Sequence, residues 1–502
     1  MFSVAPQTIK FADSLAESEY GISVLTLMKN AAFACYEQLK DIIKHDDKIV
    51  VLCGKGNNGG DGYELCRLLK EDWYDVIAVN IFGCDPNTEV AKTVYSQYID
   101  IGGKTVSTQN AIDELHDADI IIDAIFGVGF SGSIADSSDL GKIITFCNTK
   151  SDCKRVAIDV PSGINSLDGR VEGIAFKADT TLSLAYYKTG SLSYPAKAYC
   201  GDIKLLSIGL PDRLNKRVDK DAVIPDMDYV YSVLPKRTAD SNKGTFGRLL
   251  MFCGSEFITG AAVLSASGAL RSGVGLVNIA RDRETIKILQ THLTEPIFSP
   301  VDTSTENGTQ ELMSLAEKST AVLIGCGLGK DEHDKNAVFS LIKNTTKPII
   351  LDADGINAVS ENTMVLKEAK ETAILTPHPL EFSRLTNLSV SQIQSDRINV
   401  ARRFASEFNC VLVLKGASTV IAGPDGELAV CTAGGSGLSK GGSGDVLAGL
   451  CASLRAQGMS AFDSAVCAVY LHAKAGDILS EEISVHGFLP SDLPMAIAKL
   501  LP

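Results

Sequence analysis

The feature that most constrains the fold is a recurring unit: a short apolar run ends in a glycine-rich or acidic loop and leads into a helical segment. In the first half, Lys48–Cys53 reads KIVVLC and runs directly into residues 54–62, GKGNNGGDG, before a predicted helix over Tyr63–Lys70. A strand, a glycine loop and a helix form the first half of a βαβ unit. This alternation predicts an α/β fold with parallel strands and helices on both faces of the sheet.

The same alternation continues through both halves of the chain. Further strands are predicted at Val76–Phe82, Asp119–Phe126, Arg155–Val160, Arg248–Cys253, Val274–Ala280, Ala321–Gly325, Pro348–Asp352, Ala373–Leu375 and Val411–Lys415. At 502 residues the chain is too long for one ordinary core. Residues 211–227 lose apolar periodicity and gain charge and proline. We therefore predict two α/β domains, 1–224 and 225–502, the first a Rossmann-like doubly wound sheet.

Composition excludes several classes of protein. A net charge of −14 argues against a nucleic-acid partner, because little positive charge is available to neutralise phosphates. No run of apolar residues is long enough for a membrane span, and the first 20 residues lack the pattern of a secretory signal. The 13 cysteines form no Cys-x-x-Cys pair and fall mostly in apolar runs, as expected of reduced thiols in a cytoplasmic protein.

The densest glycine loop lies near the C-terminus. Residues 434–450 read GGSGLSKGGSGDVLAGL, a flexible loop followed by a predicted apolar helix. The free N–H groups and the dipole of such a helix favour an anion in the loop. Asp445 is out of place beside a bound phosphate unless it acts on a substrate, for example by accepting a proton. The structural alternative is that Asp445 merely caps the helix.

Acidic and hydroxyl side chains follow the predicted strands of the first half. Asp123 and Asp159 lie at the ends of two strands, and Ser162 follows Pro161 in a tight turn. The carboxyl ends of parallel strands meet at one sheet edge, where ligands bind in folds of this class. Each carboxylate is therefore either a loop cap or a ligand-binding acid, and the serine can present oxygen to a monovalent cation.

The second half carries comparable loops. Residues 375–381 read LTPHPLE, so that two prolines hold His378 in an extended turn before a predicted helix. This rigidity favours a site over a structural histidine. Lys415–Thr419, reading KGAST, links two predicted strands and can grip a nucleotide.

Together these motifs closely resemble the bifunctional NAD(P)H-hydrate repair enzymes. The first half resembles NAD(P)H-hydrate epimerase through GKGNNGGDG, DAIFGVGFSG and DVPSG. The second resembles ADP-dependent (S)-NAD(P)H-hydrate dehydratase, a ribokinase-like α/β domain, through SNKGTFGRLL, GCGLG, LDADGIN, LTPHPLEF, LKGAST and GGSGD. The resemblance implies that residues 1–224 interconvert the R and S epimers of hydrated NADH and NADPH. Residues 225–502 would use ADP to dehydrate the S epimer, releasing AMP and phosphate.

The resemblance also implies site residues. Catalytic roles fall to Asp159 and Asp445. The substrate-binding residues are Asn57, Asn58, Gly59, Gly60, Asp61, Gly127, Val128, Gly129, Phe130, Ser131, Gly132, Ser133, Asp159, Gly327, His378, Pro379, Leu380, Glu381 and Asp445. The nucleotide-binding residues are Lys415, Gly416, Ala417, Ser418, Thr419, Gly434, Gly435, Gly441, Gly442, Ser443 and Gly444. The first domain would bind K⁺ through Asn58, Asp123 and Ser162, and the second would bind Mg²⁺ with ADP.

Two departures and two alternatives accompany this interpretation. Cys326 stands where the family usually has proline, and Ser436–Ser439 replaces a Pro-Gly-Met-Ala-like run.

A ribokinase-like kinase for a vitamin precursor, with an accessory nucleotide-binding domain, would share the GGSGD loop. A non-catalytic scaffold would be expected to lose NNGGD or DVPSG, and both are intact. We expect the chain to form a homo-oligomer without a membrane partner.

Overall fold

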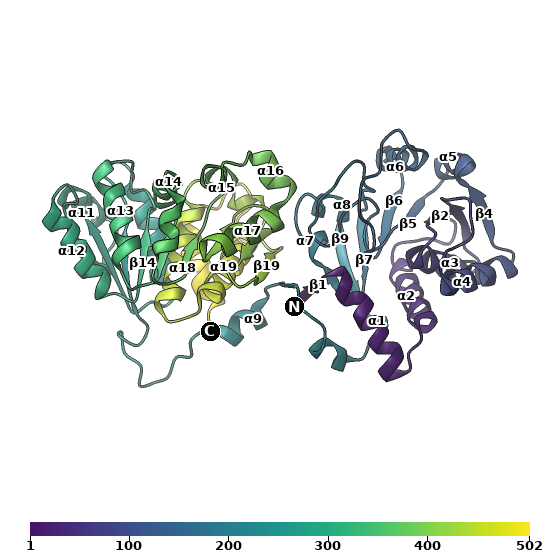
Figure 1. Cartoon of the computed structure of the whole chain (residues 1–502), viewed down its shortest axis with the longest axis horizontal. Coiled ribbons are helices and arrows are strands. Elements are labelled where there is room, and N and C mark those ends of the chain that lie inside the picture. The colour runs from purple at the N-terminus through teal and green to yellow at the C-terminus, as the bar shows by residue number, and fades with distance from the viewer. The chain divides into compact units, whose positions relative to one another are not determined.

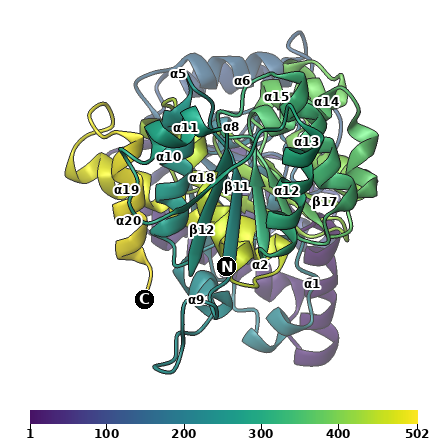
Figure 2. The ribbon, with the colours of Figure 1, turned by 90° about the vertical axis from the view of Figure 1, so that its left-hand side faces the viewer.

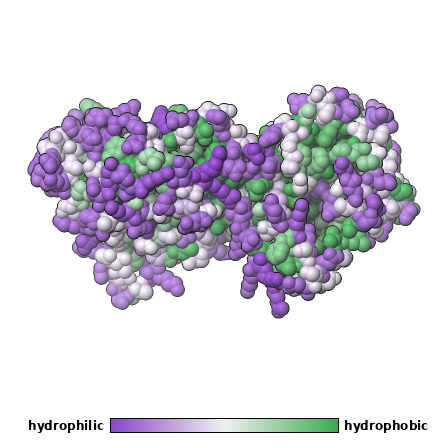
Figure 3. All heavy atoms as spheres, in the orientation of Figure 1, coloured by the Kyte–Doolittle hydropathy of each residue, from purple (hydrophilic) through white to green (hydrophobic).

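The computed structural model describes residues 1–502 and divides into two compact units, Phe2–Ala222 and Val223–Pro502, with Met1 grouped with the second (Figure 1). Hydrophilic side chains cover most of the visible surface of each unit, and smaller hydrophobic patches interrupt them (Figure 3). None of the helices combines the length and apolar character that crossing a membrane requires.

The N-terminal unit is built on a seven-stranded sheet whose strands all run parallel. In spatial order these strands are β4 (Lys104–Ser107), β3 (Asp75–Asn80), β2 (Lys48–Cys53), β5 (Ile120–Ala124), β6 (Lys154–Ile158), β7 (Thr180–Leu184) and β9 (Asp202–Leu206). The short strands β1 (Phe2–Val4) and β8 (Tyr187–Lys188) pair with each other in parallel. The predicted doubly wound parallel sheet is confirmed.

Helices cover both faces of this sheet. They are α1 (Pro6–Tyr20), α2 (Val24–Leu39), α3 (Asn57–Glu71), α4 (Glu89–Asp100), α5 (Ala111–His116), α6 (Asp139–Thr149), α7 (Thr189–Leu192) and α8 (Lys197–Cys200). Residues of α2, α3 and α4 share a buried cluster with one face of the strands, and residues of α5 and α6 share a cluster with the other. The strands are buried on both faces, which explains why they read as continuous apolar runs.

The predicted start of the third helix is wrong. The helix α3 begins at Asn57 instead of Tyr63, so the NNGGDG motif forms its first turns. Glycine is a poor helix former, and its presence here has a packing reason. A Cβ at Gly59 would lie 1.9 Å from the Gly54 carbonyl oxygen, and a Cβ at Gly62 would lie 2.7 Å from the Ala124 Cβ. The glycines therefore let the helix approach β2 and β5 closely.

The C-terminal unit contains a larger, mixed sheet. In spatial order its strands are β13 (Ile297–Pro300), β12 (Leu276–Arg281), β11 (Arg248–Phe252), β14 (Ala321–Ile324), β15 (Ile349–Leu351), β16 (Ala373–Leu375), β17 (Cys410–Leu414), β18 (Thr419–Ala422), β19 (Leu428–Cys431) and β10 (Ala222–Val223). The strands from β13 to β17 are parallel, whereas β18 runs antiparallel to its two neighbours, β17 and β19.

Helices flank this sheet, as Figure 2 shows around β11 and β12. They are α9 (Met227–Val233), α10 (Thr259–Leu270), α11 (Arg283–Leu289), α12 (Glu306–Glu317), α13 (Glu332–Asn344), α14 (Asp354–Ser360), α15 (Pro379–Thr386), α16 (Val390–Ser395), α17 (Arg397–Phe408), α18 (Ser443–Ala456), α19 (Ala461–Glu482) and α20 (Leu493–Leu500). The helices α10, α18, α19 and α20 share one buried cluster with the strands. This cluster fixes α18, and with it the GGSGD loop, over the sheet.

Candidate functional sites

A pocket of about 720 Å³ opens at the carboxyl edge of the N-terminal sheet. That volume suits a small-molecule ligand. Nine of the predicted substrate residues line it: Asn57, Asn58, Asp61, Gly127, Val128, Gly129, Phe130, Ser131 and Asp159. The other four substrate residues predicted in this unit do not line the pocket: Gly59 and Gly60 are buried in the packing of α3, and Gly132 and Ser133 follow in the loop after β5.

Asp159 is held in the pocket by a lysine that the sequence did not point to. The Lys188 ammonium forms an ion pair with the Asp159 carboxylate, and the lysine side chain is 1% exposed. It also donates to the Leu184 carbonyl oxygen at 2.7 Å and approaches the Ser183 hydroxyl at 3.3 Å. A lysine in the short strand β8 carries no sequence signal of its own; only the topology brings it to Asp159.

Two further carboxyl groups lie near this ion pair. Asp13 in α1 and Asp61 in α3 both line the pocket. Burial raises the pKa of Asp61 well above its ordinary value, with Asp159 and Asp13 adding to the effect. Burial and the neighbouring Asp159 raise the pKa of Asp13 to about 6, against the lowering effect of Lys188. Asp61 stands in a glycine motif and was predicted as a site residue, whereas Asp13 belongs to no motif and was not.

Hydrogen bonds connect the three predicted potassium ligands to one another or to the backbone of Phe126. The Asp123 carboxylate accepts bonds from the Ser162 amide and hydroxyl, both at 2.7 Å, and is fully buried. Burial raises the pKa of Asp123 to about 6, although the bonds from Ser162 oppose this. The Asn58 amide nitrogen donates to the Phe126 carbonyl at 3.0 Å, while its buried Oδ1 has no hydrogen-bond partner. A buried oxygen without a donor fits a cation.

In the C-terminal unit, Asp445 lies in the first turn of α18. Gly442 is the N-cap residue, with a φ of 101° that favours glycine, and no side chain caps the helix. The capping alternative for Asp445 is therefore wrong. Burial raises the pKa of Asp445 to about 7, with Asp352 adding to the effect and Cys326 and Lys415 opposing it. A carboxyl group that titrates near neutrality is suited to proton transfer.

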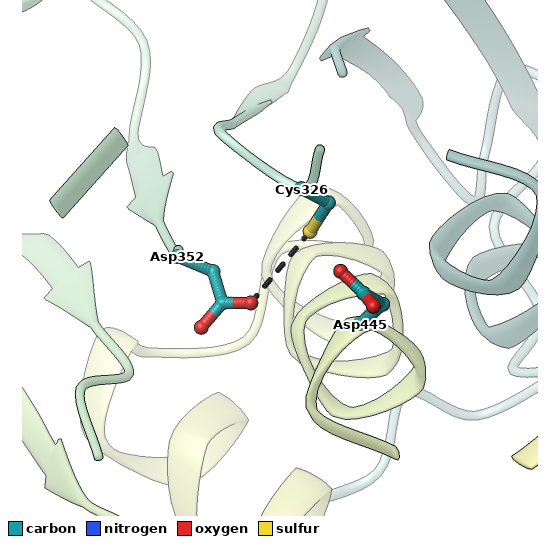
Figure 4. A group of neighbouring side chains, drawn as sticks. All are labelled: Cys326, Asp352 and Asp445. Carbon is teal, nitrogen blue, oxygen red and sulfur yellow. Dashed lines mark hydrogen bonds between the residues drawn. The ribbon is translucent and has the colours of Figure 1, made fainter. Parts of the chain in front are cut away.

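Asp445 faces a polar group at the ends of β14, β15 and β17. Side-chain atoms of Cys326, Asp352 and Asp445 lie within 4.8 Å of one another (Figure 4). The Cys326 thiol contacts Asp352 Oδ2 at 3.7 Å. Asp352 Oδ1 accepts bonds from the Thr376 hydroxyl at 2.6 Å and from the Lys415 ammonium at 3.0 Å. The Asp445 carboxylate, the Lys415 ammonium group and the N-terminus of α18 therefore lie at one site.

The glycine loop before α18 also lies close to Lys415. A Cβ at Gly444 would lie 3.2 Å from the Lys415 ammonium nitrogen, so the lysine reaches the start of α18. Burial lowers the pKa of Lys415, but the charges of Asp352 and Glu381 outweigh it and the net shift is upward. Lys415 is therefore a cation beside a helix N-terminus, which is a suitable place for phosphate. The neighbouring Ala417 and Ser418 lie in the turn between β17 and β18.

His378 has a structural role that the sequence did not predict. Its Nδ1 accepts bonds from the amides of Leu380 and Glu381, each at 3.2 Å, and thereby caps α15. The Glu381 carboxylate accepts a bond from the His378 amide at 2.9 Å. The extended turn was predicted correctly, but capping alone accounts for the position of the imidazole. A role in substrate binding stays a prediction, as it does for Gly327 and Pro379.

A second histidine, not singled out from the sequence, supports the GGSGD loop. His472 in α19 is buried, and its Nε2 donates to the Ser443 carbonyl at 3.0 Å and lies 3.1 Å from the Ser443 hydroxyl. Burial lowers the pKa of His472 to about 4, so the ring is neutral near pH 7. In the same region the Gly434 amide donates to the Asp477 carboxylate at 3.1 Å. These contacts hold both ends of the predicted nucleotide loop.

Comparisons with known proteins cover both units. The family model described as NAD(P)H-hydrate dehydratase matches residues 249–499, and the model for the YjeF-related protein N-terminus matches residues 24–190. The bifunctional NAD(P)H-hydrate repair enzyme of Moorella thermoacetica is 33% identical, over 98% of this chain and 95% of its own. The enzyme of that name from Escherichia coli is 30% identical, over 99% and 94%.

Solved structures match the C-terminal unit. A ribokinase-like superfamily protein from Enterococcus faecalis has a TM-score of 0.50 and 26% identity, covering 56% of this chain and 95% of its own. An ADP/ATP-dependent NAD(P)H-hydrate dehydratase from Bacillus subtilis, co-crystallised with ATP and Mg²⁺, has a TM-score of 0.49 and 32% identity, covering 56% and 98%.

Proposed function

The chain belongs to the family of bifunctional NAD(P)H-hydrate repair enzymes, which epimerise and dehydrate hydrated NADH and NADPH, and we propose that each unit carries one reaction. The N-terminal unit would interconvert the R and S epimers in its 720 Å³ pocket. The C-terminal unit would dehydrate the S epimer at the expense of ADP, giving NAD(P)H, AMP and phosphate. The observation that carries the second assignment is Asp445 within 4.8 Å of Asp352, at the start of α18.

In the dehydratase, the substrate hydroxyl is a poor leaving group until it is phosphorylated. Asp445 accepts the hydroxyl proton while the terminal phosphoryl group of ADP transfers to the oxygen. Lys415 and the N–H groups at the start of α18 bind the developing phosphate charge. The ring nitrogen then expels phosphate to leave a C=N⁺ cation, and loss of a proton from the adjacent ring carbon restores the carbon–carbon double bond of NAD(P)H. Mg²⁺ would accompany the nucleotide and neutralise its phosphates, and the carboxylate of Asp352 is a hard ligand that suits it.

In the epimerase, Asp159 and the amide ends of Asn57 and Asn58 would orient the hydrated nicotinamide ring. Lys188 fixes the Asp159 carboxylate in the pocket wall. The orphaned Asn58 Oδ1 and the Asp123–Ser162 pair support a K⁺ ion at the base of this pocket. Such an ion would supply positive charge and hold the loop after β5 in place. The cytoplasmic location and the homo-oligomer stay predictions.

Separated units should test the assignment directly. We expect residues 225–502 with ADP to convert only the S epimer of a mixed hydrate preparation, since each unit has its own core. Adding residues 1–224 should then accelerate consumption of the remaining R epimer above its uncatalysed rate. The measurement is the near-ultraviolet absorbance of the reduced nicotinamide, together with the phosphate released. A folded 225–502 fragment that leaves the S epimer untouched would overturn the assignment, and a stable phosphorylated product would favour the kinase alternative.

Asp123→Ala should weaken epimerisation by about 10–100-fold, the usual cost of disturbing the shell of a metal site. The variant removes the carboxylate that holds Ser162, so the response to added K⁺ should also disappear. Dehydration of the S epimer should stay at the parent rate. Asp100→Ala, which removes an exposed carboxylate at the end of α4, is the matched control. Epimerisation with the parent's rate and potassium response would refute the proposed ion site.

A further inference from the structure

The N-terminal pocket holds a carboxyl group that the proposed mechanism does not yet use. Asp13 lies in α1, ahead of residues 24–190 matched by the N-terminal family model, yet it lines the pocket together with Asp61 and Asp159. No hydrogen bond from the protein reaches either the Asp13 or the Asp61 carboxyl group. The two groups therefore face the pocket interior without a fixed partner, unlike Asp159, which is paired with Lys188.

A count of charges shows what this arrangement requires. Three carboxyl groups, those of Asp13, Asp61 and Asp159, interact with one buried ammonium, that of Lys188. Keeping an unpaired charge away from water is costly, so the surplus carboxyl groups retain protons instead. Asp61 is the deeper of the two and its pKa is raised well above the ordinary value by burial. Asp13, with a pKa raised to about 6, can both give and take a proton near neutrality.

Among the charged or titratable groups around the pocket, Asp13 is the one suited to exchange a proton near pH 7. Those contributed by the surrounding elements are Lys10, Cys35, Lys55, Asp61, Asp159, Tyr186 and Lys188. Burial raises the pKa of the Cys35 thiol and the Tyr186 hydroxyl, so neither gives up its proton near pH 7. Lys10 and Lys55 are exposed at the pocket, where ammonium groups suit the phosphates of a dinucleotide.

We propose that Asp13 is a catalytic acid–base residue of the epimerisation, an inference that rests on the proposed function of the N-terminal unit. Asp13 gives its proton to the hydroxyl of the hydrated ring, and the carbon–oxygen bond breaks to release water. The lone pair of the ring nitrogen forms a carbon–nitrogen double bond, which leaves a planar cation. Water then adds to the opposite face, the double-bond pair returns to nitrogen, and the proton lost by that water passes through pocket water to the Asp13 carboxylate.

The cycle balances, because one water leaves, one water adds, and the proton that Asp13 gives is recovered. The neighbouring groups suit the intermediate. The cation develops beside Asp159, whose carboxylate is held by Lys188, so opposite charge is in place before it is needed. This division of roles, between a carboxyl group with a raised pKa and a neighbour kept in an ion pair, is how paired carboxyl groups acquire different functions.

The test compares Asp13→Asn and Asp13→Ala in the full chain with Glu17→Gln, an exposed carboxyl group on the same helix. We expect Asp13→Asn to lower kcat for R-to-S conversion by about 10²–10⁴-fold, the usual contribution of a general acid or base. KM should change little, since asparagine keeps the size of the side chain. The rate of dehydration of the S epimer and the thermal unfolding curve report that the chain is folded. Glu17→Gln should behave as the parent.

Two readouts separate catalysis from a structural role. Formate should restore part of the epimerase activity of Asp13→Ala, because it can occupy the vacated space and carry the proton, and it should not affect the parent. In the parent, kcat/KM should change as the pH passes through about 6, and this change should be missing in Asp13→Asn. A kcat like the parent's in Asp13→Asn, or loss of activity in Asp13→Ala without rescue by formate, would overturn the role of Asp13. If the parent chain itself does not epimerise, the proposed function fails instead.

Discussion

Asp445→Asn should abolish dehydration of the S epimer, with turnover reduced about 10²–10⁴-fold by the loss of a general base. The substitution keeps the size of the side chain, and the helix loses no cap because Gly442 occupies that position. The glycine loop and Lys415 are untouched, so ADP should still bind. Epimerisation should continue at the parent rate. Dehydration at saturating ADP, with calorimetry for ADP affinity, checks both expectations.

The folded state of this variant should be at least as stable as the parent. Burial and Asp352 make the charged form of Asp445 unfavourable, and asparagine removes that charge. Asp425→Asn, which changes an exposed carboxylate in the turn between β18 and β19, is the control and should retain full activity. In the parent, kcat/KM for dehydration should fall as the pH drops below about 7, because Asp445 with a pKa of about 7 then holds its proton. Turnover within a few-fold of the parent in Asp445→Asn would remove the residue from the mechanism.

Many strands of the fold could be predicted from the sequence, because each is marked by a local run of apolar residues. Strands buried on both faces read as apolar runs, and Lys48–Cys53 was predicted with its observed bounds. The strands β4, β7 and β9 were not predicted. They read KTVS, TTLSL and DIKLL, which are short and partly polar, and their positions depend on pairing with β3, β6 and β7.

The two glycine motifs show what can and what cannot be predicted from the local sequence. NNGGDG was read as a loop because glycine disfavours helices, but contacts with Gly54 and Ala124 outweigh that propensity. GGSGD was also predicted to be a loop, with the helix starting at Val446, but α18 begins at Ser443, so only Gly441 and Gly442 precede it, and Gly442 adopts a positive φ. In both motifs the helix begins earlier than the glycines suggest, and the first motif packs against strands that are distant in sequence, which nothing local reports.

The site residues fall into two groups, those that stand beside a local motif and those that do not. Asp159 and Asp445 stand beside glycine motifs, so the sequence marks them. Asp13 and Lys188 have no such neighbours, and they enter the pocket only because α1 and β8 are brought to the edge of the sheet. Asp13 lies on α1, and nothing in the sequence indicates what that position of the helix faces. A side chain of this kind becomes a candidate only when burial and charge are known.

Lys188→Met should eliminate epimerisation and destabilise the N-terminal unit by about 3–5 kcal/mol, the cost of leaving one partner of a buried ion pair uncompensated. Lys188 is 1% exposed and Asp159 is 11% exposed, so the pair is largely shielded from water. The remaining carboxyl groups of Asp13, Asp61 and Asp159 would then face one another without a cation. Urea unfolding and R-to-S conversion are the two measurements, with dehydration of the S epimer as the internal reference.

The double variant Lys188→Met/Asp159→Asn distinguishes stability from catalysis. Removing both charges removes the uncompensated carboxylate, so most of the lost stability should return. Epimerisation should not return, because the carboxylate that faces the developing cation is gone. Lys142→Met provides the matched control: its partner Asp139 lies 3.1 Å away in an exposed pair, which contributes only about 0–1 kcal/mol. If the double variant recovers activity along with stability, the Lys188–Asp159 pair serves the fold alone, and the acid–base chemistry of the pocket must reside in its other carboxyl groups.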